Sequence, residues 1–293
     1  MKTGNKRDWK DFERGPKPPK RASVSFVNDG TKTAILVSDS FGRYIKDDGL
    51  LGEQVGAFEP VYECSAEPHS IGKISSDANK FNIIMNCYGG AKLEECMNEG
   101  LARRIMFVKP HCILFMLGMC DLATINKQDY SPNPKWFFET IMEVKRKFNR
   151  LTENNIENEE DKRYREDVIF HFATLQNWGE SWAPLSKDYI SREDVVKLRR
   201  KNVSYVQQKQ GQLWEWHRIL LVDLNVHPNT RRDSIHYSEE STQELFEKIK
   251  KVCMRYMCVK PACRMTVALH PKAIRRDVVK RGQDLTDSPS CQL

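Results

Sequence analysis

The chain has 293 residues and a mass of 34.1 kDa, which is enough for one large domain or two small ones. Its net charge of +7 belongs to the ends: residues 1–22 and 255–293 each hold eight Lys or Arg against three Asp or Glu, and residues 23–254 hold 31 basic and 34 acidic side chains. No run of 18 apolar residues occurs and the first 25 residues hold no apolar segment, so we expect neither a membrane span nor a secretory signal.

The nine cysteines are odd in number, and several lie within apolar runs. This usage favours a reduced, intracellular chain, cytoplasmic or nuclear. Cys253, Cys258 and Cys263 recur every five residues, unlike the ligands of zinc knuckles, so we predict no metal site there and no cofactor. Clustered prolines in Gly15-Pro-Lys-Pro-Pro-Lys-Arg21 predict a disordered N-terminal tail, and the Pro-Lys-Arg run resembles a weak nuclear-import signal.

Five short apolar runs follow one another along the chain and do not alternate with polar residues, as is typical of strands that are covered on both faces. They are Thr33–Ser38, Phe81–Cys87, Cys112–Leu117, Val168–Thr174 and Arg218–Asp223. Helical patterns between and after them span residues 91–98, 134–151, 191–208 and 238–257. Repeated strand–helix units predict a three-layer α/β/α sandwich with a five-stranded parallel sheet.

The domain boundaries follow from this order of elements. We expect a disordered basic tail over residues 1–30, one domain over 31–258, and a second basic, disordered tail over 259–293. Residues 43–80 carry no clear pattern and form a loop or insertion, and residues 154–166 read as a charged surface loop. Basic tails of this kind can bind nucleic acid or an anionic membrane, although solvated, disordered ends are the simpler interpretation.

Unusual residues stand where each predicted strand ends. Ser40 follows the first strand, Gly89-Gly90 the second, and Cys120-Asp121 the third; Trp178 follows the fourth, and Asp233 and His236 follow the fifth. The carboxyl ends of parallel strands lie along one edge of a sheet, where open α/β folds form their sites. A serine, a histidine and a carboxylate on one edge can perform nucleophilic acyl transfer.

At these residues the chain resembles the SGNH, or GDSL, hydrolase superfamily, whose members share a flavodoxin-like sandwich and four sequence blocks. Ser38-Asp39-Ser40 resembles the Gly-Asp-Ser block, and Gly90, or else Gly89, resembles the glycine of block two. Gly118-Met-Cys120-Asp121 resembles the Gly-x-Asn-Asp block, and Asp233-Ser-Ile-His236 resembles the Asp-x-x-His block. The resemblance covers about residues 31–255, with the blocks in the order that the family shows.

The resemblance implies a role for each matched residue. Ser40 would be the nucleophile, His236 its general base and Asp233 the carboxylate that orients the imidazole. The backbone N–H groups of Ser40 and Gly90 would stabilise the oxyanion, and the substrate would be a small acyl ester. Cys120 replaces the asparagine that donates to the oxyanion in the family. Since a thiol is a poor donor, this change predicts a weakened oxyanion hole.

Other interpretations stay open at this point. Ser40 also suits a helix N-cap, and Asp233 and His236 suit the start of the last helix. Asp121 is interpreted as a structural carboxylate, while Trp178 and Trp182 form either the wall of an acyl pocket or part of the core. The alternative function is a catalytically degenerate SGNH-like domain that serves as an RNA-binding or scaffold module. A PC-esterase-like member of the superfamily is the narrower alternative, because that group also departs from the usual third block.

Overall fold

A computed structural model gives the fold. It describes residues 32–51, 54–58, 69–76, 79–87, 89–176, 184, 186–226 and 236–258. The tails predicted over residues 1–30 and 259–293 lie outside the described residues, so their predicted disorder is not tested. Among the described residues, every helix is too short or too polar to cross a lipid bilayer.

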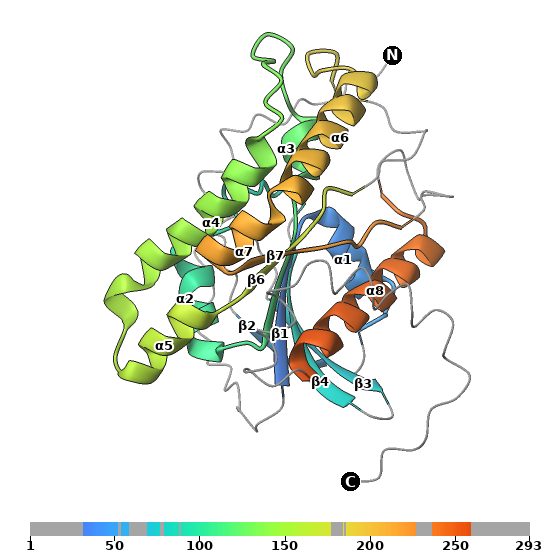
Figure 1. Ribbon diagram of the computed structural model, residues 1–293. Coiled ribbons are helices and arrows are strands. Elements are labelled where there is room, and N and C mark those ends of the chain that lie inside the picture. Colours follow the sequence, from blue (N-terminus) through green and yellow to red (C-terminus); the bar gives the residue numbers. More distant parts are fainter. Residues whose placement is uncertain are drawn as a thin grey trace, which may run out of the picture.

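The described strands form one sheet in the order β2-β3-β4-β1-β5-β6-β7 (Figure 1). Five of them run parallel: β4 (Asn79–Cys87), β1 (Lys32–Ser38), β5 (Cys112–Met116), β6 (Phe170–Ala173) and β7 (Ile219–Val222). In chain order these five give the arrangement 2-1-3-4-5, which is the flavodoxin-like order. The predicted parallel sheet and its five strands are therefore confirmed.

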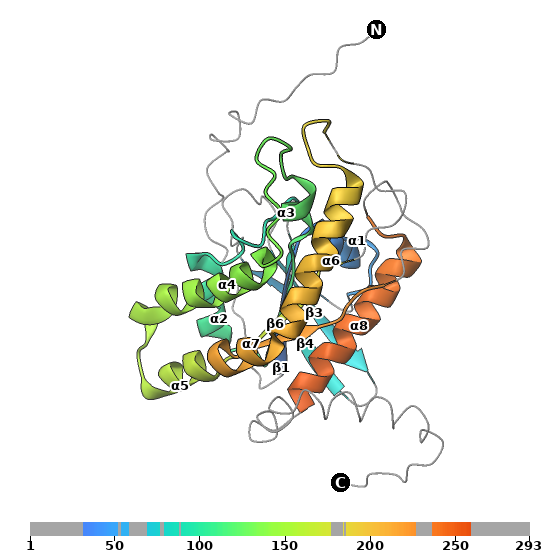
Figure 2. The ribbon, with the colours of Figure 1, turned by 45° about the horizontal axis from the view of Figure 1, so that its top comes forward.

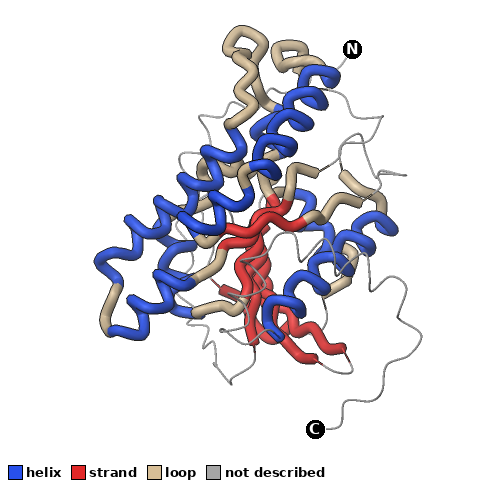
Figure 3. Tube along the Cα trace, in the orientation of Figure 1, coloured by secondary structure: helices blue, strands red, loops and turns tan. Residues whose placement is uncertain are grey.

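Helices cover both faces of this sheet (Figures 1 to 3). On one face α1 (Ser40–Asp47) packs against α8 (Glu239–Cys258). On the other, α4 (Trp136–Thr152) packs against α2 (Glu99–Val108), α6 (Arg192–Gln208) and α7 (Gln210–His217). The strands are buried from both sides as their apolar sequences require, and the ring of Phe115 in β5 stacks on Phe172 in β6 with centroids 4.7 Å apart.

Residues 43–80 contain more order than a loop. They hold the end of α1 and two antiparallel strands, β2 (Gln54–Phe58) and β3 (His69–Ser76), which extend the sheet beyond β4. The sheet therefore has seven described strands, and the prediction of a five-stranded sheet was incomplete. Short strands with glycine and polar residues are typical of a sheet edge, and they lack the apolar runs that identified the central strands.

Two further predictions of secondary structure were wrong. Residues 91–98 form turns, and α2 begins after Asn98, whose Oδ1 accepts a hydrogen bond of 2.9 Å from the N–H of Leu101. The supposed loop at 154–166 contains η2 (Glu153–Asn155) and most of α5 (Glu159–Asp167), which Asn158 caps through the N–H of Asp161. In both places an asparagine that satisfies a free N–H group of the first turn decides where the helix begins. Ser191 caps α6, since its Oγ accepts from the N–H of Asp194 at 3.2 Å.

Candidate active site

Ser40 stands at the carboxyl end of β1, as the first residue of α1. The chain can turn sharply here because residue 42 is glycine: a Cβ at Gly42 would lie 2.6 Å from the side chain of Ser38 and 2.8 Å from the Sγ of Cys87. The N–H of Gly42 instead donates to the Oγ of Ser38 at 3.1 Å. Ser38 itself, which replaces the glycine of the resembling motif, is not among the residues with positive φ, so its side chain brings no backbone strain.

The structure brings His236 to Ser40 from the other end of the chain. The Nε2 of His236 lies 2.8 Å from the Oγ of Ser40, within hydrogen-bonding distance. His236 immediately precedes α8, and the packing of α8 against α1 joins the two residues across 196 positions of sequence. The rings of Phe41 and Tyr44, both on α1, flank the imidazole with centroids 5.7 and 4.9 Å away.

The segment around His236 is anchored to the neighbouring strand ends. Tyr237 is buried, and its hydroxyl donates to the side-chain oxygen of Gln176 at 3.4 Å. Arg199 of α6 reaches the same place, where its Nε donates to the carbonyl of Gln176 at 2.7 Å and its Nη2 donates to Asn225 at 3.2 Å. These contacts hold the ends of β6 and β7 and the start of α8 together. Nothing in the sequence pattern singled out Gln176, Arg199 or Asn225, because their pairing depends on tertiary packing.

Two predicted site residues, Asp233 and Trp178, lie outside the described residues, as does Trp182. Their predicted roles therefore stay predictions.

The glycine turn after β4 and the short helix after β5 face each other beside Asp39. Gly89 and Gly90 are exposed, and Gly90 has a φ of +76°, a conformation that favours glycine. Burial raises the pKa of Cys120 in α3 (Met119–Ala123) to about 12, and the nearby Asp39 adds to the rise, so the thiol is neutral at physiological pH. The backbone N–H of Gly90 acts in the opposite direction, because it favours the thiolate.

Asp39 is a buried carboxylate that the sequence marked only as part of a motif. Its Oδ1 accepts a hydrogen bond of 3.0 Å from the N–H of Phe41, and its Oδ2 lies 3.9 Å from the Sγ of Cys120. Burial is the main cause that raises the pKa of Asp39 to about 7, and the charge of Asp121 acts in the same direction. Burial also raises the pKa of Asp121 to about 6. Asp121 accepts from the N–H of Leu93 at 2.9 Å, the kind of contact expected of a structural carboxylate.

The described residues contain no group of three or more His, Cys, Asp or Glu side chains arranged to hold a metal ion. The described part of the site offers a hydroxyl in contact with an imidazole, together with backbone N–H groups. A hydroxyl beside a base is the arrangement that nucleophilic acyl transfer uses.

No protein-family model matches the sequence, and the comparison with curated proteins finds no match. Solved structures of esterases are similar to the chain, all at low identity. A carbohydrate esterase family 3 protein from Talaromyces cellulolyticus is 15% identical, with 78% of this chain and 100% of that chain covered and a TM-score of 0.42. A member of the lipolytic G-D-S-L family from Veillonella parvula is 11% identical, with 77% and 100% covered and a TM-score of 0.38.

A catalytic mutant of an acetylxylan esterase from Geobacillus stearothermophilus is 12% identical, with 78% of this chain and 95% of that chain covered and a TM-score of 0.39.

Proposed function

We propose that the chain is a serine ester hydrolase of the SGNH type that acts on a small acyl ester. The observation that carries this proposal is the 2.8 Å contact between the Oγ of Ser40 and the Nε2 of His236. A serine hydroxyl becomes a nucleophile when a neighbouring base can take its proton as the bond to the carbonyl carbon forms. The four motifs and the flavodoxin-like strand order support the same class.

The reaction would proceed through an acyl-enzyme. The Oγ of Ser40 attacks the ester carbonyl while the Nε2 of His236 takes the hydroxyl proton. His236 then gives this proton to the leaving alcohol, and a water molecule, activated by the same imidazole, hydrolyses the acyl group from Ser40. Asp233 would orient His236 through the Nδ1 nitrogen, because it stands three residues earlier in a motif of that pattern.

The oxyanion would be stabilised by the N–H groups of Ser40 and Gly90. Ser40 begins α1, so its N–H belongs to the first turn, where free N–H groups favour negative charge. Cys120 stands where the motif has asparagine, and a thiol is a poor hydrogen-bond donor to an oxyanion. Because the usual asparagine donor is missing, we expect kcat to be about a hundred- to a thousandfold lower than in an esterase that has this donor.

Turnover of p-nitrophenyl acetate and labelling by a fluorophosphonate test the proposal directly. The wild-type chain should hydrolyse the ester and become labelled, and Ser40→Ala should do neither. Ser38→Ala is the matched control, because Ser38 is buried beside Ser40 and bonds only to the backbone of Gly42 among the described contacts. Equal background labelling of wild type and Ser40→Ala would exclude the proposal that the chain is a serine hydrolase with Ser40 as its nucleophile.

The replacement of the usual asparagine by Cys120 also favours a second candidate, a catalytically degenerate domain that binds a partner. This candidate predicts no labelling of Ser40 at any reagent concentration that labels an ordinary serine esterase. The same labelling experiment therefore separates the two.

A further inference from the structure

Helix α6 carries two kinds of cation. Arg199 points inward and donates to the backbone carbonyls of Leu175 and Gln176 at 2.9 and 2.7 Å, so its charge supports the fold. Its neighbours Arg200 and Lys201 are exposed and take no part in that network. The outward face of α6 therefore needs a separate explanation.

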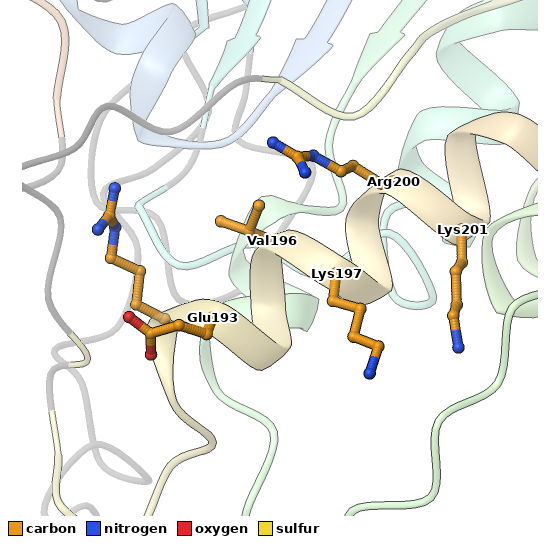
Figure 4. A pocket seen from close by; sticks show the side chains of 6 residues that line it. Glu193, Val196, Lys197, Arg200 and Lys201 are labelled. Atoms are coloured by element: carbon orange, nitrogen blue, oxygen red, sulfur yellow. The ribbon is translucent and has the colours of Figure 1, made fainter.

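This outward face is hollowed. A shallow pocket of about 520 Å³ lies on α6, with a lining that is mostly basic: Arg192, Glu193, Val196, Lys197, Arg200 and Lys201. These residues recur at spacings of three and four, so they share one side of the helix. Figure 4 shows Lys197, Arg200 and Lys201 projecting from successive turns of α6. Four cations thus stand against a single carboxylate, that of Glu193.

The charge of this face is not neutralised within the part of the chain that the structure describes. No ion pair within 4 Å is formed there by any of the four cations, and the Nε of Arg192 is buried without a hydrogen-bond partner. Some exposed cations on other helices are paired: Arg103 pairs with Glu99, and Arg150 pairs with Glu143 at 2.6 Å. A cationic stripe on a body whose residues 23–254 hold more acidic than basic side chains indicates an anionic partner.

We propose that the outward face of α6 binds the phosphodiester backbone of a nucleic-acid strand. Nine residues of helix separate Arg192 from Lys201, a length of about 13 Å. Along the axis of a duplex the phosphates of one strand follow one another about every 3.4 Å, which places roughly four charges over this length. The contacts would be to phosphates, so the face would bind without regard to base sequence.

A lipid surface fits the same face less well. Lasting attachment of a helix to a membrane requires apolar side chains that insert below the headgroups. Val196 is the one apolar residue among the six that line the pocket. The nucleic-acid proposal is also independent of the proposed esterase, because it uses no residue of the Ser40 site.

The test compares two variants of the full chain that carry the same change in net charge. The first is K197Q/R200Q/K201Q, which removes the three exposed cations of the face. The control is R103Q/R150Q/K162Q, whose cations are exposed but lie beside carboxylates on α2, α4 and α5. The probe is a fluorescent single-stranded RNA of 20 nucleotides, with binding followed by anisotropy from 50 to 200 mM salt. Both basic tails are present in every protein, so differences between variants report the helix faces.

We expect the α6 variant to bind RNA about tenfold more weakly at 50 mM salt and to lose about 2 units from the slope of log K against log salt. The control should retain at least half of the wild-type affinity. Equal losses in both variants would show a general charge effect and overturn the proposal. It would also be overturned by unchanged RNA binding, or by a loss of binding to vesicles with 30% anionic lipid that exceeds the loss for RNA. Far-UV circular dichroism and melting verify that both variants are folded.

Discussion

The two ends of the parallel sheet each bury an ionisable side chain, and burial moves both pKa values to about 7 from opposite directions. Asp39 lies at the carboxyl end, where its pKa is raised from 3.8. Lys145 of α4 lies at the amino end, where its Nζ donates to the carbonyl of Val168 at 2.9 Å and its pKa is lowered from 10.5. The Nζ of Lys145 also lies 4.5 and 5.3 Å from the ring centroids of Phe170 and Phe148.

The surroundings of Asp39 and Lys145, and not the sizes of their pKa shifts, distinguish the two ends of the sheet. Asp39 adjoins Ser40, which contacts His236, and it lies beside the glycine turn and Cys120. Lys145 is surrounded by aromatic rings and a backbone carbonyl, and Arg165, His217 and Arg218 are ionisable groups near it. A displaced pKa is a stronger sign of a functional site where a hydroxyl and a base lie in contact beside it. The described residues have such a pair at the carboxyl end, Ser40 with His236, and none beside Lys145.

The largest expected effect comes from removing the base at the carboxyl end. In His236→Gln the side chain can still form a hydrogen bond with Ser40 but cannot carry the proton, so kcat for p-nitrophenyl acetate should fall about 10⁴-fold. Lys145→Met at the opposite end should leave kcat within twofold of the wild-type value. A His236→Gln protein that retains a tenth of the activity would show that the measured contact is not catalytic.

The next largest expected effect is a gain in kcat. Cys120→Asn would place an amide N–H donor at the position of the thiol, so kcat should rise by about 100-fold. Cys120→Ala provides the matched control, since it removes the thiol without adding a donor, and its kcat should stay within severalfold of wild type. If Asn and Ala change kcat alike, residue 120 does not face the oxyanion.

The sheet was predictable because its five parallel strands are buried on both faces and therefore are apolar throughout. β2, which forms one edge of the sheet, and β3 beside it contain glycine and polar residues, and they were missed because they have no such run. The start of α2 was misplaced because the predicted helix included Asn98, the residue that caps the first turn. The sequence did carry that signal, as it carried the cap of α5 at Asn158.

The contact of Ser40 with His236 was also predictable, because the carboxyl ends of parallel strands must lie along one edge. The contacts that surround this pair were not predictable. The contact of Arg199 with Gln176, the contact of Cys120 with Asp39, and the burial of Asp39 depend on how segments from distant parts of the chain pack together. A polar residue at a strand end shows where a site lies, but its neighbours within the site are set by tertiary structure.

At the amino end of the sheet, replacing Lys145 should change the free energy of unfolding. The pKa of Lys145 is lower in the folded chain than in the unfolded one, so the unfolded chain binds more protons between about pH 7 and 10.5. Wild-type stability therefore rises with pH across this window, and the full cost of burying the charge is present below it. Lys145→Met should stabilise the chain by about 2 kcal/mol at pH 6, after the loss of the bond to Val168, with a smaller gain at pH 9. Urea unfolding at both pH values measures this, and a gain that grows with pH would contradict it.

Asp39→Asn should show the opposite pH dependence and the smallest effect. The folded pKa of Asp39 lies above the ordinary value of 3.8, so the folded chain binds more protons between about pH 4 and 7, and wild-type stability falls across that window. Asparagine can still accept from the N–H of Phe41 through its side-chain oxygen, without the buried charge. We expect a gain of about 1 kcal/mol at pH 8 and none at pH 4, measured by urea unfolding beside Lys145→Met. Parallel pH profiles for the two variants would mean that the two ends of the sheet do not differ in the sign of their buried charge.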